Sequence, residues 1–206
     1  MPTGMQCPGI AIEMNKTIIK FTPFGPVVII WDVPEERPKI TRVLLSKLSE
    51  SVLEKTKELY PMVYEASCEE IDFIATGMLR FLEGEAVDFS LDIADLDSCG
   101  EFQQRVLRAE HGIPRGKVST YKLIAACLGV PGGARAVGNA LANNPFPLII
   151  PCHRAIRSDL TLGGYQGGLK MKHALLSNEG IVFNDSGKVQ CSQFFYENET
   201  GRNYER

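Results

Sequence analysis

The stretch of this 206-residue chain that is most informative about its fold runs from Asn144 to Arg154 and reads NPFPLIIPCHR. Its apolar centre, Leu148-Ile149-Ile150, is followed by Pro151, and proline interrupts regular backbone structure. We therefore expect a turn at Cys152 and His153. Such a turn is needed for the two side chains to act together, because neighbours in a helix or strand do not face each other.

A cysteine attacks as the thiolate, and a nearby imidazole can accept its proton. A Cys-His pair alone more often means a buried thiol beside a surface histidine, so the flanking sequence decides. Residues 162–168 read LGGYQGG, in which four glycines around Tyr165 suit a loop that approaches a flat ligand closely. A short helix through Lys172 then ends at Gly180, and Glu179 is a candidate for orienting His153.

The composition indicates a globular protein, with 44% hydrophobic and 23% charged residues. No apolar run approaches the roughly 18–20 residues that span a bilayer, and the N-terminus lacks the pattern of a secretory signal. We therefore expect a cytoplasmic protein, nuclear in a eukaryote, that does not bind membranes. The six cysteines show no C-x-x-C spacing and, with three histidines, do not predict a metal site. The sequence leaves open whether any of them form a disulfide.

The net charge of −3 is unevenly distributed along the chain. Residues 1–95 hold nine Lys and Arg against sixteen Asp and Glu, giving −7, whereas residues 96–183 hold ten against five, giving +5. Residues 184–206 hold three against four, giving −1. Affinity for a polyanion depends on local charge, so only the middle segment suits nucleic acid.

The change of charge coincides with a change of predicted structure. In the first part, Thr17–Phe21 and Val27–Trp31 predict two strands, and a long helix is expected from Pro38 through Leu53. Ser67 and Glu70 match a capping box for a helix that ends at Gly84. Val87–Asp92 alternates apolar and polar residues, which predicts a strand.

The second part is predicted to be mostly helical. One helix contains Phe102 and Val106, and a second is capped by Ser119 or Thr120 and ends at Gly129. A third helix covers 134–143, and the short Gly-containing turn before it favours a helix-turn-helix. The polar segment after Phe183 is expected to be a loosely docked extension. The predicted domains are 1–95, 96–184 and 185–206.

The third helix has two different faces. At 100° per residue, Ala134, Val137, Gly138 and Leu141 fall on one side, and Arg135, Asn139, Ala142 and Asn143 fall on the other. The second face carries one cation, two amides and nothing bulky, so it can approach a nucleic-acid backbone closely. An ordinary solvated face of a helical hairpin is the competing interpretation.

With these motifs in place, the chain resembles the O6-alkylguanine-DNA alkyltransferase family. The matching segments lie, in order, between Gly116 and Gly180. They are GKVSTY (116–121), RAVG (135–138), NP (144–145), IPCHR (150–154), GY (164–165) and the LL…EG segment (175–180). The resemblance implies an α+β protein, with a ribonuclease-H-like N-terminal domain followed by a winged-helix-like, helix-turn-helix C-terminal domain.

The resemblance also implies catalytic roles. Cys152 matches the residue that accepts the alkyl group, and His153 the one that takes its proton through a bound water. Glu179 matches the carboxylate that holds this histidine, and Asn144 the asparagine that bridges the active-site turn and the DNA-binding helices. Tyr121 matches the tyrosine that helps to swing out the nucleotide and donates a hydrogen bond to the departing guanine.

Other positions are implied to contact DNA or the extruded base. Arg135 matches the arginine that fills the vacated base stack. The further expected DNA-binding residues are Thr120, Tyr121, Ala136, Gly138 and Asn139. The expected substrate pocket consists of Pro147, Gly164, Tyr165 and Gln166. Leu160 and Gln166 depart from the family pattern, which often has glycine and a smaller residue there, so the range of adducts larger than methyl is left open.

The implied reaction is a single, irreversible transfer of a methyl group from O6-methylguanine in double-stranded DNA to Cys152. The nucleotide must leave the stack, at a cost of a few kcal/mol. The thioether product has no hydrolysable bond, so we expect a monomer that acts once, with no metal, no cofactor and no external methyl donor. Two alternatives stay open: a non-catalytic alkyltransferase-like protein that only binds the lesion, and a cysteine hydrolase acting on a small acyl or peptide substrate.

Overall fold

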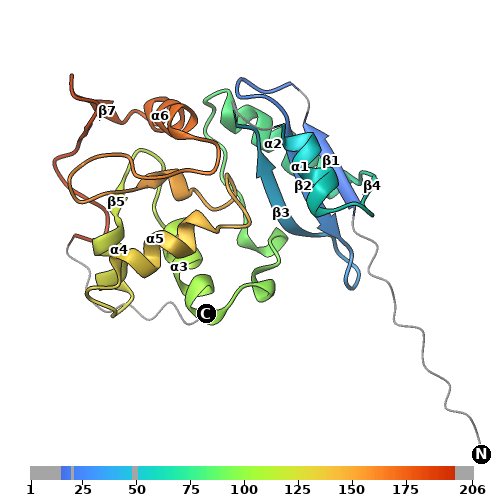
Figure 1. The fold of residues 1–206 in the computed structure, drawn as a ribbon, viewed down its shortest axis with the longest axis horizontal. Helices are drawn as coiled ribbons and strands as arrows, with labels where there is room; N and C mark the ends of the chain where they lie inside the picture. Colours follow the sequence, from blue (N-terminus) through green and yellow to red (C-terminus); the bar gives the residue numbers. More distant parts are fainter. Residues whose placement is uncertain (1–14, 20, 48–50, 198–206) are drawn as a thin grey trace, which may run out of the picture.

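The computed structural model describes residues 15–19, 21–47 and 51–197, which form a mixed α/β structure with two halves side by side (Figure 1). The first half contains β1 (Asn15–Ile19), β2 (Val27–Asp32), β3 (Lys39–Leu45), α1 (Val52–Leu59), β4 (Tyr64–Glu65) and α2 (Glu69–Leu82). The second contains α3 (Glu101–His111), β5 (Ser119–Thr120), α4 (Tyr121–Cys127), α5 (Ala134–Ala142), β6 (Ala155–Ile156), α6 (Leu169–Asn178), β7 (Val182–Phe183) and β8 (Val189–Gln190). None of the helices in these ranges is long and apolar enough to cross a bilayer.

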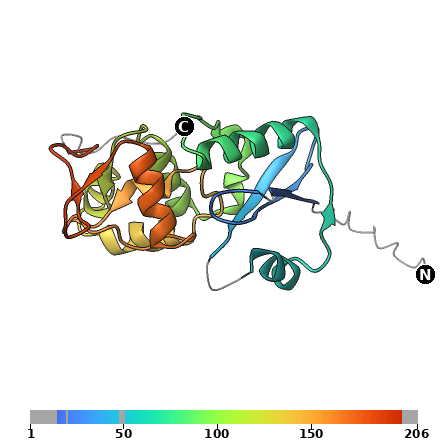
Figure 2. The ribbon, with the colours of Figure 1, turned by 90° about the horizontal axis from the view of Figure 1, so that it is seen from above.

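The first half is built on a four-stranded sheet in the order β3-β2-β1-β4, in which only β4 runs parallel to its neighbour. The central strand β2 is buried along its whole length. Val28 and Ile30 pack with Val52 of α1, whereas Ile29 and Trp31 belong to the main core with α2. Alternate residues of a strand face opposite sides, so the two helices cover opposite faces of the sheet (Figure 2).

The predicted strands at Thr17–Phe21 and Val27–Trp31 are confirmed as β1 and β2, although Lys20 lies outside the described residues. The predicted helix from Pro38 through Leu53 is wrong. Residues 39–45 form β3, which pairs with β2, and α1 begins only at Val52. The segment is rich in β-branched residues, and pairing with a buried neighbour decides in favour of a strand where the apolar spacing fits both.

Two further predictions in the first half are wrong. The helix α2 is preceded by Cys68 without a side-chain cap, and the Ser67 hydroxyl instead donates to the Asp72 carboxylate, so no capping box forms. Residues 87–92 do not form a strand, because they find no strand to pair with among the described residues and continue into a 3₁₀ turn at Leu91–Ile93. The predicted end of α2 at Gly84, whose φ is +102°, is confirmed.

The helices predicted in the second half are confirmed as α3, α4 and α5. The Thr120 hydroxyl accepts a hydrogen bond from the Leu123 amide at 3.1 Å and caps α4. Gly129 ends this helix with a φ of +74°, in the left-handed region that favours glycine. The α3 side chains then hold both helices, because Arg105 donates to the Leu128 carbonyl and Gln103 to the carbonyls of Ala140 and Asn143.

The segment after Phe183 is not loosely docked up to Glu197, the last described residue. Its β8 strand pairs with β7, and the Phe195 amide donates to the Val118 carbonyl at 2.9 Å. Tyr196 is buried and donates from its hydroxyl to the Ala109 carbonyl at 2.7 Å. Widely spaced apolar residues, rather than a periodic pattern, anchor this segment.

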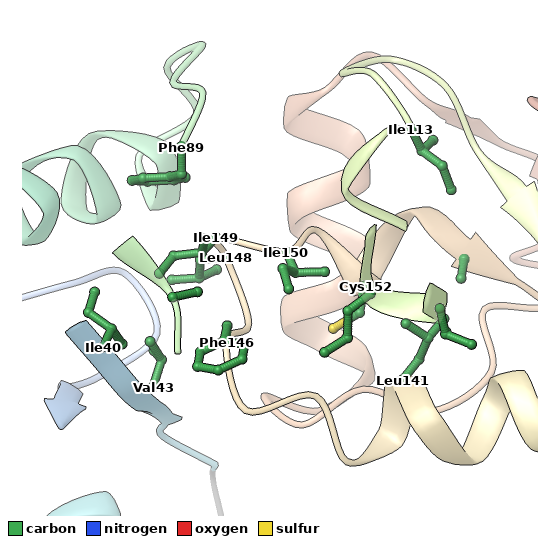
Figure 3. Packing of buried hydrophobic residues seen from close by; sticks show 14 of the residues in the cluster. Ile40, Val43, Phe89, Ile113, Leu141, Phe146, Leu148, Ile149, Ile150 and Cys152 are labelled. Carbon is green, nitrogen blue, oxygen red and sulfur yellow. The ribbon is translucent and has the colours of Figure 1, made fainter. Parts of the chain in front are cut away.

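One apolar cluster continues from the sheet into the helical half. Phe146, Leu148 and Ile149 lie between Ile40 and Val43 of the first half and the turn that carries Cys152 (Figure 3). The Val43 amide also donates to the Pro145 carbonyl at 2.7 Å. The two halves therefore share a core, and the N-terminal sheet supports the loop that leads to Cys152.

Candidate functional site

The expected turn is present at Cys152 and His153. Residues Cys152–Arg154 form a short 3₁₀ helix, and the preceding apolar run does not form a strand but bends at Leu148, whose φ is +78°. Asn144 fixes this bend from its buried position, since its side-chain amide donates to the Ile150 carbonyl at 3.2 Å. Its side-chain oxygen accepts from the Phe146 amide at 2.9 Å. One asparagine thus joins the end of α5 to the cysteine turn.

His153 and Glu179 meet inside the protein, as the sequence predicts. The His153 Nε2 lies 2.9 Å from Glu179 Oε1, and both side chains are almost fully buried. Glu179 follows α6 and is held there by the left-handed turn at Gly180, whose φ is +85°. The ring of His153 also packs edge-on against Phe81 of α2, with 5.8 Å between ring centroids.

Arg154 also belongs to this cluster, although the sequence motifs did not predict a contact between it and Glu179. Its guanidinium donates to both oxygens of Glu179 at 2.7 to 3.2 Å and to the Ile113 carbonyl at 2.6 Å. Although burial opposes ionisation, hydrogen bonds from His153 and Arg154 lower the pKa of Glu179 to about 2. A carboxylate can only accept, so the proton of the neutral imidazole lies on Nε2 and Nδ1 keeps its lone pair.

Cys152 and His153 are both uncharged in the resting site. Burial raises the pKa of Cys152 to about 11, while a hydrogen bond from Asn144 acts in the opposite direction. Burial lowers the pKa of His153, partly opposed by Glu179. At neutral pH the pair is therefore a thiol beside a neutral imidazole whose Nδ1 is buried without a hydrogen-bond partner among the described residues.

The glycine-rich loop packs over the cysteine and histidine. The ring of Tyr165 lies edge-on to His153 at 6.3 Å, and its buried hydroxyl has no hydrogen-bond partner in the described part of the chain. Gly163 has a φ of +70°, and a Cβ there would lie 2.7 Å from the Tyr121 hydroxyl oxygen. A side chain is therefore excluded, which lets Tyr121 stand directly against the loop. Burial raises the pKa of Tyr121 to about 12, so it remains a hydrogen-bond donor.

The other three residues expected in the pocket differ from one another in burial and in their contacts. Pro147 is buried beneath the turn, and Gly164 is exposed, with its carbonyl 3.3 Å from Lys172 Nζ. Gln166 donates to the Asn144 carbonyl at 2.5 Å, which ties the loop to the end of α5. Leu160 has a φ of +70°, which is the conformation glycine adopts most easily.

The expected DNA-facing residues fall into two groups. Arg135, Ala136 and Asn139 are exposed on α5, and Gly138 is partly exposed. Thr120 differs, because it is buried and its hydroxyl caps α4. The structure therefore brings the α5 residues to one outer surface and keeps the Thr120 side chain inside.

Charged residues at the site were harder to find from the sequence. Besides Arg154, Lys172 and Glu110 are fully buried next to the cysteine turn. The helical spacing does indicate that both residues are buried. Lys172 lies three and four residues before Leu175 and Leu176, on the same face of its helix. Glu110 lies three and four residues after the buried Leu107 and Val106, on the same face of α3. Charged side chains usually lie at the surface, whereas the positions of these two on their helices favour the interior.

No group of three or more His, Cys, Asp and Glu side chains is arranged to hold a metal ion in the part of the chain that the structure describes. Five cysteines are free thiols, namely Cys68, Cys99, Cys127, Cys152 and Cys191. Cys7 lies outside the described residues.

Comparisons with known proteins identify relatives of this site. Residues 101–181 match the family described as 6-O-methylguanine DNA methyltransferase, DNA binding domain. A methylated-DNA--protein-cysteine methyltransferase of Methanothermobacter thermautotrophicus is 52% identical over 101 residues, which cover 49% of this chain and 56% of that protein. The protein of the same name from Mycobacterium leprae is 47% identical over 100 residues, covering 48% and 59%. The chain thus aligns with little more than half the length of these curated relatives.

Solved structures extend the likeness over most of the chain. A crystal structure of Mycobacterium tuberculosis OGT-R37K matches with a TM-score of 0.61 and 30% identity, covering 81% of this chain and 92% of that one. Mycobacterium tuberculosis OGT in complex with DNA matches with a TM-score of 0.61 and 29% identity, covering 82% and 93%.

Proposed function

We propose that this chain, which belongs to the 6-O-methylguanine DNA methyltransferase family, repairs DNA by moving a methyl group from guanine O6 to Cys152. The observation that carries the proposal is the buried contact between His153 and Glu179, beside a cysteine fixed in a turn. It gives the thiol a neighbouring base whose orientation is set by a carboxylate, which is the arrangement nucleophilic catalysis requires.

The residues divide the chemistry between them. The thiol proton passes to His153 Nδ1, directly or through one water, while Glu179 stabilises the imidazolium that forms. The sulfur then attacks the methyl carbon, a carbon–sulfur bond forms and the bond from carbon to guanine O6 breaks. Tyr121 donates a hydrogen bond to the departing guanine anion, which then takes up one proton and leaves as neutral guanine, while His153 gives up the proton it took from the thiol, so that no net charge is left on the site. The thioether cannot be hydrolysed, so each molecule acts once, without a metal or an external methyl donor.

DNA recognition is assigned to α4 and α5 as a helix-turn-helix. The exposed residues Arg135, Ala136 and Asn139, with the partly exposed Gly138, form a surface without bulky side chains that can enter a groove. A methylated guanine must leave the stack before Cys152 can reach it, and Arg135 offsets part of that cost by filling the gap. The Thr120 side chain is committed to the helix cap, so we assign any contact at this position to its backbone.

The loop around Tyr165 is assigned to the pocket that holds the extruded base, with Gly164, Gln166 and Pro147. Tyr165 supplies an aromatic wall beside His153. The Gln166 amide is tied to the Asn144 carbonyl and narrows the loop side of the pocket, so we expect methyl to be accepted more readily than bulky adducts.

At the level of domains, we propose a ribonuclease-H-like unit at 1–95 and a winged-helix-like alkyl-acceptor unit at 96–184. The sheet flanked by α1 and α2 supports the first assignment, and α3 to α5 support the second. The extension at 185–206 would then belong functionally to the second unit, because Tyr196 anchors it to α3. We propose that the protein acts as a monomer on double-stranded DNA.

The decisive experiment mixes the protein with a duplex that contains one O6-methylguanine and follows its intact mass. We expect a gain of one methylene group per protein molecule, mapped to the Cys152 peptide. Cys152→Ser should bind the duplex without gaining mass, whereas Cys127→Ser, which removes another buried thiol, should still be methylated. Label that stays on the DNA would support a lesion-binding protein, and repeated turnover of an activated ester would support a hydrolase.

A second experiment tests the role of α5. Arg135→Ala is expected to slow repair of the duplex about tenfold or more, because nothing then fills the vacated stack, with little effect on reaction with free O6-methylguanine. Lys57→Ala, which removes an exposed cation from α1 outside the proposed DNA-binding helices, is the matched control and should slow both reactions little. Equal losses on duplex and free base for Arg135→Ala would contradict a role in base extrusion.

A further inference from the structure

The proposed mechanism gives no role to Glu110, a buried ionisable residue. Glu110 lies in the last turn of α3, on the same face as Val106 and Leu107, and has 0% exposed surface. Neither carboxyl oxygen has a hydrogen-bond partner among the described residues, although the Ala155 amide approaches it. A buried, unpaired carboxyl group costs free energy, so its presence beside the reactive turn calls for an explanation.

Glu110 and Cys152 share the same buried neighbours. Both α3 and α6 contact the 3₁₀ helix that carries Cys152. The titratable and charged groups that face Glu110 are Lys172 from α6, Arg154 and Cys152 from the 3₁₀ helix, and Tyr121 from α4. Lys172 donates to the Ala155 carbonyl at 2.6 Å, so the same residue, Ala155, lies against both Lys172 and Glu110.

Arg154 is already committed to another acceptor, since it is paired with Glu179 through several short hydrogen bonds. Lys172 donates only to backbone carbonyls, and no acidic group forms an ion pair with it among the described residues. Its positive charge is therefore available to two competitors inside the same buried cluster, the carboxyl group of Glu110 and the sulfur of Cys152.

The electrostatic effects run in the expected directions. Burial raises the pKa of Glu110 to about 8, and it lowers that of Lys172 to about 8. A negative charge on Glu110 raises the pKa of Cys152, whereas the positive charge of Lys172 lowers it. The two residues therefore have opposite effects on the thiolate.

We propose that Glu110 is a positioning residue for methyl transfer, which acts by deciding whether the ammonium group of Lys172 serves the Cys152 sulfur or a carboxylate. With Glu110 uncharged, Lys172 stabilises the thiolate. With Glu110 ionised, Lys172 is drawn into an ion pair and the thiolate faces a second negative charge. The effect of Glu110 on methyl transfer rests on the proposed function. Its effect on the ionisation of the Cys152 thiol does not, and can be measured separately.

The test compares wild type with Glu110→Gln, which keeps the shape of the uncharged acid. Two rates are measured between about pH 6 and pH 9: methylation by the O6-methylguanine duplex, and alkylation of Cys152 by iodoacetamide, mapped to its peptide by mass. We expect equal rates near pH 6 and a variant several-fold faster near pH 8, where Glu110 of the wild type is partly ionised and Lys172 still carries part of its charge, because one unit in the thiol pKa is a tenfold change in thiolate. Glu101→Gln, an exposed carboxyl group on the same helix, should follow wild type throughout.

The outcomes separate this inference from the proposed function. A ratio of variant to wild-type rates that stays constant across pH in both reactions overturns the role of Glu110, even if methyl transfer occurs. If neither protein accepts a methyl group but the iodoacetamide ratio still rises with pH, the assigned function fails and the control of Cys152 by Glu110 stands.

Should Glu110→Gln not fold, the wild-type protein alone provides the answer. The carboxyl carbon of Glu110, followed by NMR, is expected to titrate over the same pH range in which the iodoacetamide profile flattens. A Glu110 that is fully ionised below about pH 6 would overturn the proposal.

Discussion

Two buried glutamates flank the cysteine turn, and they differ in almost every respect except burial. Glu179 follows α6 and accepts hydrogen bonds from His153 and Arg154, and its pKa is lowered to about 2. Glu110 lies in the last turn of α3, its carboxyl oxygens have no hydrogen-bond partner in the described ranges, and its pKa is raised to about 8. Partners, rather than depth, therefore set the charge of a buried carboxyl group here.

The different pKa values of the two glutamates suit them to different roles. A permanently ionised Glu179 can hold the imidazole of His153 in one tautomer at any physiological pH. A carboxyl group such as Glu110, which changes charge close to neutrality, can instead modulate its neighbours.

The largest effect is expected from Glu179→Ala. It leaves the guanidinium of Arg154 buried without its anionic partner, which typically costs about 3–5 kcal/mol of unfolding free energy. Urea unfolding near pH 7 measures this loss, and methyl transfer should fail in parallel because His153 is no longer oriented. Asp185→Ala removes an exposed carboxylate and should change stability little. A loss below about 1 kcal/mol for Glu179→Ala would mean that the network is not structural.

The next effect concerns the pH dependence of stability. Glu110 has a higher pKa in the folded than in the unfolded chain, so its contribution is complete below about pH 4.5 and is lost as pH rises toward 8. Relative to wild type, Glu110→Gln should therefore gain about 3 kcal/mol of unfolding free energy between pH 5 and pH 8. Glu179 has the opposite sign, because its stabilisation is present above about pH 4.5 and is lost as pH falls through about 2. If the unfolding free energies of wild type and Glu110→Gln change with pH in parallel, Glu110 does not titrate differently from an ordinary carboxyl group.

A smaller effect is expected where the C-terminal segment meets α3. The Tyr196 hydroxyl donates to the carbonyl of Ala109, the residue before Glu110, at 2.7 Å. Tyr196→Phe leaves that buried acceptor unsatisfied and should cost about 1 kcal/mol, independently of pH. Thermal and urea unfolding measure it, with Tyr64→Phe as an exposed control. A cost that varies with pH would show that this contact acts through Glu110.

Much of the second half could be predicted from the sequence, because its signals are local. Gly129 was predicted to end α4, and the cap was predicted at Ser119 or Thr120, of which the structure selects Thr120. The motif around Cys152 also placed His153 and Glu179 in one site, since their order and spacing resemble those of a known family. The sequence also marked Leu160 as unusual, because the family often has glycine at this position. The structure gives Leu160 the left-handed backbone conformation that glycine adopts most easily.

The first half was harder to predict because its signals are not local. The segment 39–45 has apolar spacing that also fits a helix, and only its pairing with β2 makes it a strand. The segment 87–92 has strand-like alternation but no partner strand in the described ranges. Pairing is a property of the assembled sheet, so no short stretch of sequence reveals it.

Short stretches of sequence were enough to name the candidate site residues, a cysteine, a histidine and a glutamate in a recognisable order, and to predict several helix ends. The charge states around these residues follow only from the folded chain. It brought Arg154 to Glu179 and left Glu110 unpaired near Lys172, although all four are simply charged residues in the sequence. The physical reason is that the pKa of a buried group depends on burial and on neighbours distant in the chain, which only the folded state defines.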